Sequence, residues 1–276
     1  MTNRARLLGW CSALFLLTLG ALQLSPFYIA LTTALKRKSD LSSPWLPPSP
    51  GHVYWGNFRT AVEEGKILQA IVNSVVITSA ATFLVCLVGA LAAYPLARRR
   101  TWSNRAVTVI VLGAMMVPPL SVLVPLYTMM SQLHGINTYW GTVLVLATGQ
   151  LPLGIFLYAA FIRTIPLSLE EAGSVDGAGV FRVFFRIVMP LLKPVTATVA
   201  IVSGVFVWND YQLSVYLLTD ENVRTIAPSI GAFFSQQSSN LGAASAASLL
   251  GVAPVLIAYV ALQRHFMKGM LAGAEK

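Results

Sequence analysis

Long stretches without an Asp, Glu, Lys or Arg residue dominate the chain. A helix needs about 20 mostly apolar residues to cross the hydrocarbon core of a membrane. The uncharged stretch 106–162 is long enough for two such helices, and it divides at the turn-like segment 134–137. Because backbone polar groups must be paired internally in lipid, the spanning segments must be helices. The pattern predicts an all-α membrane protein with six transmembrane helices, over about residues 7–35, 67–97, 106–133, 139–162, 194–218 and 241–262.

The first span is expected to stay in the mature protein. Arg4 and Arg6 precede it, as basic residues do in a secretory signal peptide. Its apolar run is longer than the roughly 7–15 residues usual for a signal peptide. The basic segment Lys36-Arg37-Lys38 follows it, where a signal peptide has a small-residue cleavage site. The segment is therefore predicted to be a retained span.

The distribution of Lys and Arg predicts the orientation, because basic residues accumulate on the cytoplasmic side. Six spans place both termini on the same side of the membrane. The opposite side carries six basic residues, namely Lys36, Arg37, Lys38, Arg59, Lys66 and Arg224. The side of the termini carries the other thirteen of the chain's 19 Lys and Arg residues. We therefore expect a protein of the bacterial cytoplasmic (inner) membrane with both termini in the cytoplasm, an extracytoplasmic loop 36–66 and a cytoplasmic loop 163–193.

The composition agrees with a membrane protein and excludes an ordinary soluble enzyme. Apolar residues make up 56% of the chain and charged residues 11%, against roughly 45–50% and about 25% in typical soluble domains. The net charge of +9 follows mainly from the topology, and the chain has no basic domain that would bind nucleic acid. Cys11 and Cys86 lie in separate apolar stretches and indicate neither a disulfide framework nor a metal site.

The cytoplasmic loop 163–193 contains two predicted short helices joined by a turn. Ser168, followed three residues later by Glu171, is typical of a capping box. In that motif the hydroxyl accepts a hydrogen bond from an early helix amide, and the carboxylate reaches back to the cap amide. We expect the first helix to begin directly after Ser168 and to end in a turn at Asp176-Gly177.

The second helix of this loop is expected to be amphipathic. Helical spacing predicts one apolar face and an opposite face with two arginines, and Pro190 is expected to stop or kink the helix. The apolar face either rests on the neighbouring spans or contacts a partner protein. Its predicted members are Val180, Phe181, Phe184, Phe185 and Val188, and the arginines are Arg182 and Arg186.

The spacing in this loop resembles the EAA loop of binding-protein-dependent ABC importers. In this chain the pattern reads Glu171-Ala172-Gly173, then Gly177, Ile187 and Pro190. It departs from the family pattern at Gly173, where the family has Ala, and at Met189, where it has Leu. Short segments in the same order along nearly the whole chain are similar to MalG-like permease subunits of carbohydrate importers: Asn57-Phe58, Asn73-Ser74, 92–98, Met116-Val117-Pro118, Pro125-Leu126-Tyr127, Trp208-Asn209-Asp210 and Gln263-Arg264 to Gly269.

This resemblance implies the type I ABC importer permease fold, in which two permease subunits form one translocation path through the membrane lipid. The expected partners are a second MalG- or MalF-like permease subunit, an ABC ATPase dimer and an extracytoplasmic sugar-binding protein that delivers the sugar. The EAA loop would couple ATP hydrolysis on the partner to movement of the spans. The residues that the resemblance assigns to ATPase coupling are Glu171, Ala172, Gly173, Asp176, Gly177, Ala178, Phe181, Phe185, Ile187 and Pro190.

The chain itself is not expected to be an enzyme or to bind a cofactor. Its sequence has no phosphate-binding motif G-x-x-x-x-G-K-[ST], because its one Gly-Lys pair, Gly65-Lys66, is followed by Ile67. The three histidines lie in separate places and suggest no catalytic constellation. ATP and Mg are therefore expected on the partner ATPase.

The residues that would contact sugar are the least determined part of the sequence. Polar and aromatic residues within the spans are candidates for the substrate path, although each is equally suited to binding helices together or to anchoring at the membrane interface. Asp210 is the only acidic residue within a predicted span. The candidates are Asn73, Ser74, Tyr127, Trp208, Asn209, Asp210, Tyr211 and Gln212.

Three other functions remain open at this point. An autonomous secondary transporter usually shows internal repeats and several ionisable residues in the membrane, whereas we find no convincing repeat and one acid. An ABC permease for a solute other than a sugar would show the same loop. A membrane scaffold without a transport role is disfavoured by the prolines 118, 119 and 125 in the third span, although membrane helices also tolerate proline.

Overall fold

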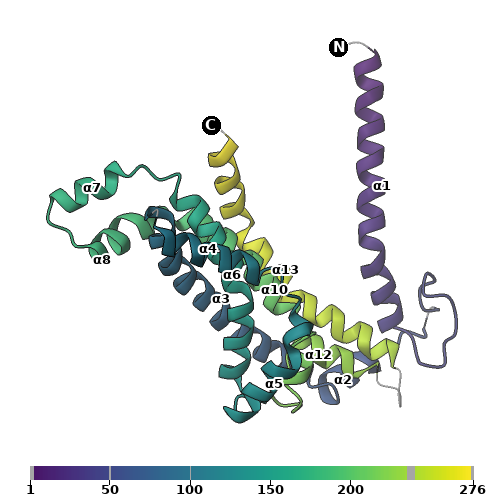
Figure 1. Cartoon of the computed structure of the whole chain (residues 1–276). Coiled ribbons are helices and arrows are strands. Elements are labelled where there is room, and N and C mark those ends of the chain that lie inside the picture. Colours follow the sequence, from purple (N-terminus) through teal and green to yellow (C-terminus); the bar gives the residue numbers. More distant parts are fainter. Residues whose placement is uncertain (1–2, 50, 100, 235–239, 275–276) are drawn as a thin grey trace. The chain divides into compact units, whose positions relative to one another are not determined.

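The computed structural model describes residues 3–49, 51–99, 101–234 and 240–274, and helices are the only regular structure in these ranges. The predicted all-α fold is confirmed. Figure 1 labels the longer helices and shows their order along the chain. The helices are α1 (Asn3–Ala34), α2 (Gly56–Glu63), α3 (Ile67–Arg98), α4 (Trp102–Ala114), α5 (Leu123–Gln132), α6 (Tyr139–Ile162), α7 (Ser168–Val175), α8 (Val180–Val183), α9 (Met189–Leu191), α10 (Lys193–Trp208), α11 (Ser214–Leu217), α12 (Ile226–Ala232) and α13 (Leu241–Ala274).

The chain forms two compact units. The first comprises Met1–Ile67 and Ser229–Ile257, and the second comprises Leu68–Pro228 and Ala258–Lys276. The second unit contains the loop that resembles an EAA loop.

In the first unit, the side chain of Asn57 holds the end of α1. Its Nδ2 donates to the carbonyl oxygens of Ala34 (2.9 Å) and Lys36 (2.7 Å), and the residue is buried. These carbonyls belong to the helix end, where backbone acceptors lack helical partners. A Cβ on Gly242 of α13 would lie only 2.5 Å from Asn57 Nδ2. The lack of a side chain at Gly242 therefore lets α13 pack directly on this cap.

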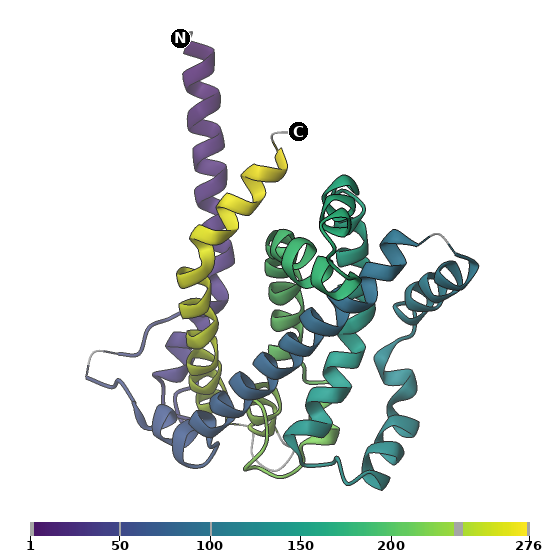
Figure 2. The same cartoon turned by 90° about the vertical axis from the view of Figure 1, so that its left-hand side faces the viewer.

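The core of the second unit lies where α3, α6 and α10 meet (Figure 2). Tyr158 of α6 is fully buried and its hydroxyl lies 3.0 Å from Oγ1 of Thr196 on α10. A Cβ on Gly154 of α6 would lie 2.9 Å from Cγ1 of Val85 on α3. Such close approach of backbones through small residues is usual between transmembrane helices, because packing rather than water exclusion holds them together.

In the part of the chain that the structure describes, three helices are long and apolar enough to cross a membrane as single spans: α1, α3 and α6. The number of spans rises to as many as five if each of two bent helix pairs counts as one span. These pairs are residues 102–114 with 119–132 and residues 180–191 with 193–208. Within α13, the apolar stretch Leu241–Ile257 is shorter than a full span. The count of six spans therefore stays a prediction, as do their limits.

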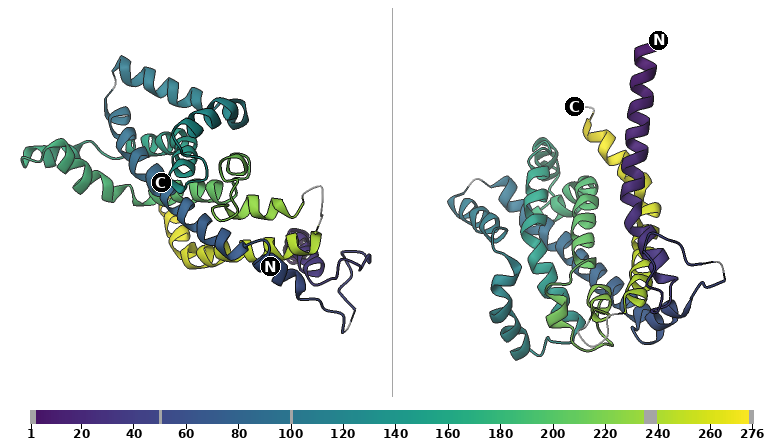
Figure 3. Two further views of the ribbon diagram at one scale, coloured as in Figure 1. Left: turned by 90° about the horizontal axis from the view of Figure 1, so that it is seen from below. Right: turned by 90° about the vertical axis from the view of Figure 1, so that its right-hand side faces the viewer.

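The predicted third span is not one continuous helix. Residues Trp102–Ala114 and Pro119–Gln132 meet at an angle of 98° (Figure 3). Pro118 takes an extended conformation with ψ of 132°. Proline lacks the amide hydrogen that a helix needs, and it disfavours helical geometry in the residue before it. The pair Pro118-Pro119 therefore ends the helix, where a single span over 106–133 was expected.

The predicted fifth span, 194–218, is also interrupted. The helix α10 ends at Trp208, and the short helix α11 follows after residues 209–213. Asp210 thus lies beyond the end of a helix and not inside one.

Candidate coupling site

The loop between α6 and α10 contains the two short helices that the sequence predicts. The first, α7, ends at Val175, and Gly177 follows in the left-handed region with φ of +80°. A Cβ on Gly177 would meet nothing within 4 Å, so its requirement is conformational and not one of space. Glycine adopts positive φ without steric cost. The predicted turn at Asp176-Gly177 is confirmed.

The predicted capping box at the start of α7 is wrong. Ser168 is the first helical residue, Leu167 occupies the cap position, and no side chain caps the helix. The helix begins one residue earlier than predicted, because carbonyl groups of Pro166 and Leu167 accept hydrogen bonds from its first amides. The amide of Leu169 donates to the carbonyl of Pro166 (3.3 Å), and the amide of Glu170 donates to the carbonyl of Leu167 (2.9 Å). Ser168 therefore lies too far along the helix to serve as its cap.

A buried ion pair holds α7 to the end of α3. Oε1 of Glu170 accepts a hydrogen bond from Nε of Arg98 (2.7 Å), and Nη2 of Arg98 lies 2.6 Å from the same oxygen in the ion pair. Its Oε2 accepts from the hydroxyl of Tyr94 at 2.7 Å, and Arg98 Nη2 also donates to the carbonyl of Ile165 at 3.0 Å. The side chains of Arg98 and Glu170 are only 14% and 7% exposed. Charge-assisted hydrogen bonds are among the strong ones, so Glu170 anchors α7.

Gly173 allows α7 to pack against the segment that follows α8. A Cβ on Gly173 would overlap Cδ1 of Ile187, and Gly173 is buried. Ala178 also donates its amide to the carbonyl of Gly173 at 2.9 Å. Gly173 and Ile187 were both expected in the coupling loop, and the structure brings them into contact. Glycine in place of the family's alanine provides the space for Ile187.

The predicted single apolar face of the second helix is wrong. Val183, Phe184 and Val188 are buried, whereas Phe181 is 78% and Phe185 48% exposed. The chain forms a π-helical turn over Phe184–Val188, and this wider turn changes which residues share a face. Phe184 packs against Tyr94 of α3, with ring centroids 5.1 Å apart.

Five exposed residues of the loop form a set that we call the outer residues. They lie on α7, on α8 and in the π-helical turn that follows α8, and Figure 1 shows α7 and α8 in the loop that leaves the rest of the second unit. Val175 is 88% and Phe181 78% exposed, and exposed apolar side chains that gather on a surface mark interaction sites. Asp176 and Pro190 are exposed and Ala178 and Ile187 half-buried. The outer residues are Glu171, Ala172, Val175, Phe181 and Phe185.

Two of the predicted substrate-path residues bind other parts of the chain. Nδ2 of Asn73 donates to the carbonyls of Asn222 (2.9 Å) and Arg224 (2.8 Å), and its Oδ1 accepts from the hydroxyl of Tyr139 (2.7 Å). Oγ of Ser74 accepts from the amide of Ile226 at 2.8 Å. Both residues are buried. The alternative role of fastening one segment to another therefore explains them better.

The candidates at the end of α10 are mostly accessible. Asp210 accepts from the amide (2.9 Å) and hydroxyl (2.7 Å) of Ser214, the first residue of α11. Asn209 donates to the carbonyl of Val205 at 2.8 Å. Among the described residues, no hydrogen bond joins Asn73 or Ser74 to the segment 208–212. Tyr211 and Gln212 are exposed, Trp208 is half-buried, and Tyr127 on α5 is 42% exposed.

Two sets of contacts were not predicted from the sequence, namely the ion pair that anchors α7 and the hydrogen bonds of Asn137. Tyr94 and Arg98 end a family-like segment, but nothing in the sequence pairs them with Glu170. Asn137 has φ of +58°, and its Oδ1 accepts from the amides of Thr219 (2.7 Å) and Asp220 (2.9 Å). The turn-like segment 134–137 was a usable signal for the left-handed conformation, which Asn tolerates, but not for its partners.

With this geometry established, comparison with known proteins identifies the family. Residues 60–271 match the family described as the binding-protein-dependent transport system inner membrane component. The chain belongs to this family. Members are membrane components of binding-protein-dependent importers, so this chain is a multi-pass protein of the cell membrane and a permease subunit of such an importer.

Two relatives and one solved structure agree with the family. The chain is 42% identical to the melibiose/raffinose/stachyose import permease protein MelC of Bacillus subtilis over 252 residues, 91% of each chain. It is 32% identical to AmyC of Thermoanaerobacterium thermosulfurigenes, a probable permease for starch degradation products, over 94% of each chain. A chain of a bacterial ABC transporter that imports the acidic polysaccharide alginate matches with a TM-score of 0.78 and 19% identity, over 96% of this chain and 99% of that one. This last match confirms the ABC importer permease fold.

Proposed function

We propose that this chain is one of two permease subunits of an ATP-driven importer that moves a carbohydrate into the cell. The observation that carries the proposal is the 42% identity to a melibiose, raffinose and stachyose import permease over 91% of both chains. The second permease subunit would complete the path. A binding protein outside the membrane would deliver the sugar, and a dimer of ATPase subunits would bind ATP and Mg, so that this chain binds neither.

The coupling of this permease to the ATPase is assigned to the outer residues of α7 and α8. Three features of the loop support the assignment. Glu170 and Arg98 anchor α7 to the long helix α3, so a push on α7 is transmitted to a spanning helix. The apolar side chains of Val175 and Phe181 are 88% and 78% exposed, as in a surface that a partner covers. Glu171 is exposed beside them, and it is free to contact a basic or polar group of the ATPase.

The cytoplasmic position of this loop and of both termini belongs to the same proposal. It is supported by the thirteen basic residues on that side against six on the other, of 19 in all. For the sugar, Tyr127, Tyr211 and Gln212 keep exposed side chains, whereas Asn73 and Ser74 are used inside the protein. An aromatic ring with nearby hydrogen-bonding groups suits a sugar, so these three residues and Trp208 are the path residues we retain.

The experiment that tests the substrate class is sugar-stimulated ATP hydrolysis by the assembled importer. The complex would be purified with its binding protein and offered melibiose, raffinose, maltotriose, glycerol phosphate and an amino acid mixture. We expect α-galactosides or another oligosaccharide to stimulate hydrolysis. Stimulation by the amino acids alone, with none by any sugar, would contradict a carbohydrate importer while leaving the ABC family unaffected.

A further inference from the structure

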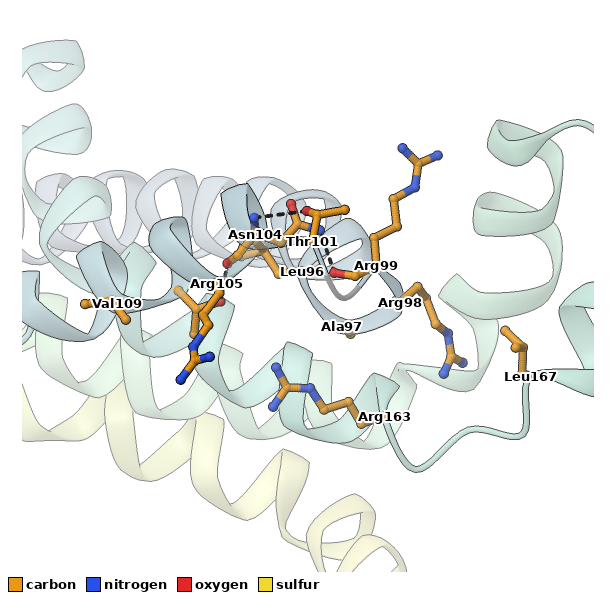
Figure 4. Close-up of a pocket in the computed structure, with 11 residues that line it drawn as sticks. Leu96, Ala97, Arg98, Arg99, Thr101, Asn104, Arg105, Val109, Arg163 and Leu167 are labelled. Atoms are coloured by element: carbon orange, nitrogen blue, oxygen red, sulfur yellow. Dashed lines mark hydrogen bonds between the residues drawn. The ribbon is translucent and has the colours of Figure 1, made fainter.

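A cavity of about 820 Å³ lies where the end of α3, the start of α4 and the end of α6 meet. Figure 4 shows that its lining is strongly basic. Among the lining residues are Arg98, Arg99, Arg105, Arg163, Asn104 and Leu167. The coupling of α7 does not explain this cavity, because only Arg98 and Leu167 of these residues take part in holding or starting that helix.

Arg105 and Arg163 point toward one another across the cavity (Figure 4). Arg105 lies in the first turn of α4, and Arg163 directly follows the last residue of α6. Neither is paired with a carboxylate among the described residues, and Glu170 is already bonded to Arg98 and Tyr94. Two facing guanidinium groups repel each other, and an anion bound between them converts this repulsion into two charge-assisted contacts.

The surroundings place the cavity at the edge of the hydrocarbon layer. On α4, the apolar side chains of Val109 and Ile110 are 63% and 69% exposed, which suits contact with lipid tails. Trp102, at the start of the same helix, is 84% exposed, and exposed tryptophans of membrane proteins gather at the level of the lipid headgroups. The arginines therefore lie at headgroup level, on the side that the basic residues assign to the cytoplasm.

We propose that this cavity binds the headgroup of an anionic phospholipid, with Arg105 and Arg163 holding its phosphate. Basic pockets between membrane helices on the cytoplasmic side suit such headgroups. Free inorganic phosphate shares the same chemistry, but it lacks the acyl chains that would lie along the exposed apolar residues of α4. The inference rests on the membrane position of the chain and not on which solute is transported.

The lipid would lie beside the anchor of α7. Leu167 lines the cavity and is the residue at which α7 begins. Arg98 lines the same cavity while it holds Glu170. A bound headgroup would thus share a wall with the coupling loop.

The test is the amount of phosphatidylglycerol that the assembled importer retains, measured by native mass spectrometry after exchange into zwitterionic detergent. Arg105→Gln and Arg163→Gln are each expected to lower the affinity for this lipid about fivefold, and the double variant about 25-fold. Arg182→Gln removes the same charge from an exposed arginine of α8 that does not line the cavity. It is expected to retain lipid as the wild type does.

Two results would overturn the proposal. Equal retention by the wild type and the double variant, with both complexes assembled to the same extent, would show that the two arginines do not hold lipid. Release of the lipid by inorganic phosphate at millimolar concentration, together with equal retention of phosphatidylcholine, would indicate a phosphate site and not a lipid site. Neither result depends on sugar transport, so failure here is distinguishable from failure of the proposed function.

Discussion

Glu170→Gln is expected to loosen α7 from α3 without unfolding the permease. The substitution keeps the shape of the side chain but leaves the guanidinium of Arg98, 14% exposed, without its charged partner. Removing one member of a buried ion pair costs about 3–5 kcal/mol. Gln still offers one carbonyl oxygen to Tyr94 or Arg98, so we take the lower limit of about 3 kcal/mol. This corresponds to about a hundredfold increase in the open population of α7.

Hydrogen exchange of the α7 amides in the purified permease, without ATPase, measures this opening directly. Glu171→Gln is the matched control, because it makes the same chemical change one residue away on an exposed side chain. We expect faster exchange over residues 168–175 in Glu170→Gln and unchanged exchange in Glu171→Gln. The double variant Arg98→Met with Glu170→Met should recover slow exchange, because replacing both members by apolar residues is often neutral or stabilising.

The reasoning is refuted if exchange in α7 is the same in Glu170→Gln and the wild type. That result would mean that the ion pair does not hold the helix. A global loss of protection in α3 and α6 would instead show that the pair supports the whole unit and not α7 alone.

Three further tests, at Gly177, Gly173 and Asp210, probe the loop and the end of α10. Gly177→Val should abolish co-purification of the ATPase, because a β-branched residue is strained at φ of +80°. Gly177→Asn should retain the ATPase, because Asn tolerates this conformation. Equal ATPase binding by both variants would show that the turn is not required. Gly173→Leu should weaken ATPase binding by displacing Ile187. Adding Ile187→Ala to this variant should restore ATPase binding. If binding is not restored, the introduced leucine side chain disturbs a residue other than Ile187. Asp210→Leu should lower transport and Asp210→Asn should not, because Asn still accepts hydrogen bonds from Ser214 and Leu cannot. Equal transport by the wild type and both variants would leave Asp210 without a role.

The helices could be predicted from the sequence where lipid alone dictates the structure. In α1, α3 and α6 the absence of charge over more than 20 residues leaves helix as the only way to pair the backbone. The break at Pro118-Pro119 could be predicted as a kink, because proline cannot continue a helix, but its angle of 98° could not. Asp210 was misplaced because an uncharged stretch shows where a helix is permitted and not where it ends.

In the coupling site too, some features could be predicted from the sequence and others could not. The turn at Gly177 is a local property, because two adjacent residues suffice to indicate positive φ. The Arg98–Glu170 pair joins residues 72 positions apart, and no periodicity connects them. Regular helical spacing placed Phe181 and Phe184 on one face, but only Phe184 is buried, in contact with Tyr94, and residues 184–188 form a π-helical turn that this spacing does not predict.

Uptake of labelled raffinose by proteoliposomes tests most directly that this chain is an ATP-driven sugar permease coupled through α7 and α8. The vesicles would contain the complete importer, with ATP on the side of the ATPase and the binding protein on the other. We predict accumulation that requires both ATP and the binding protein and that is lost in Gly177→Val. Accumulation by this chain alone, driven by an ion gradient and unaffected by Gly177→Val, would contradict the account.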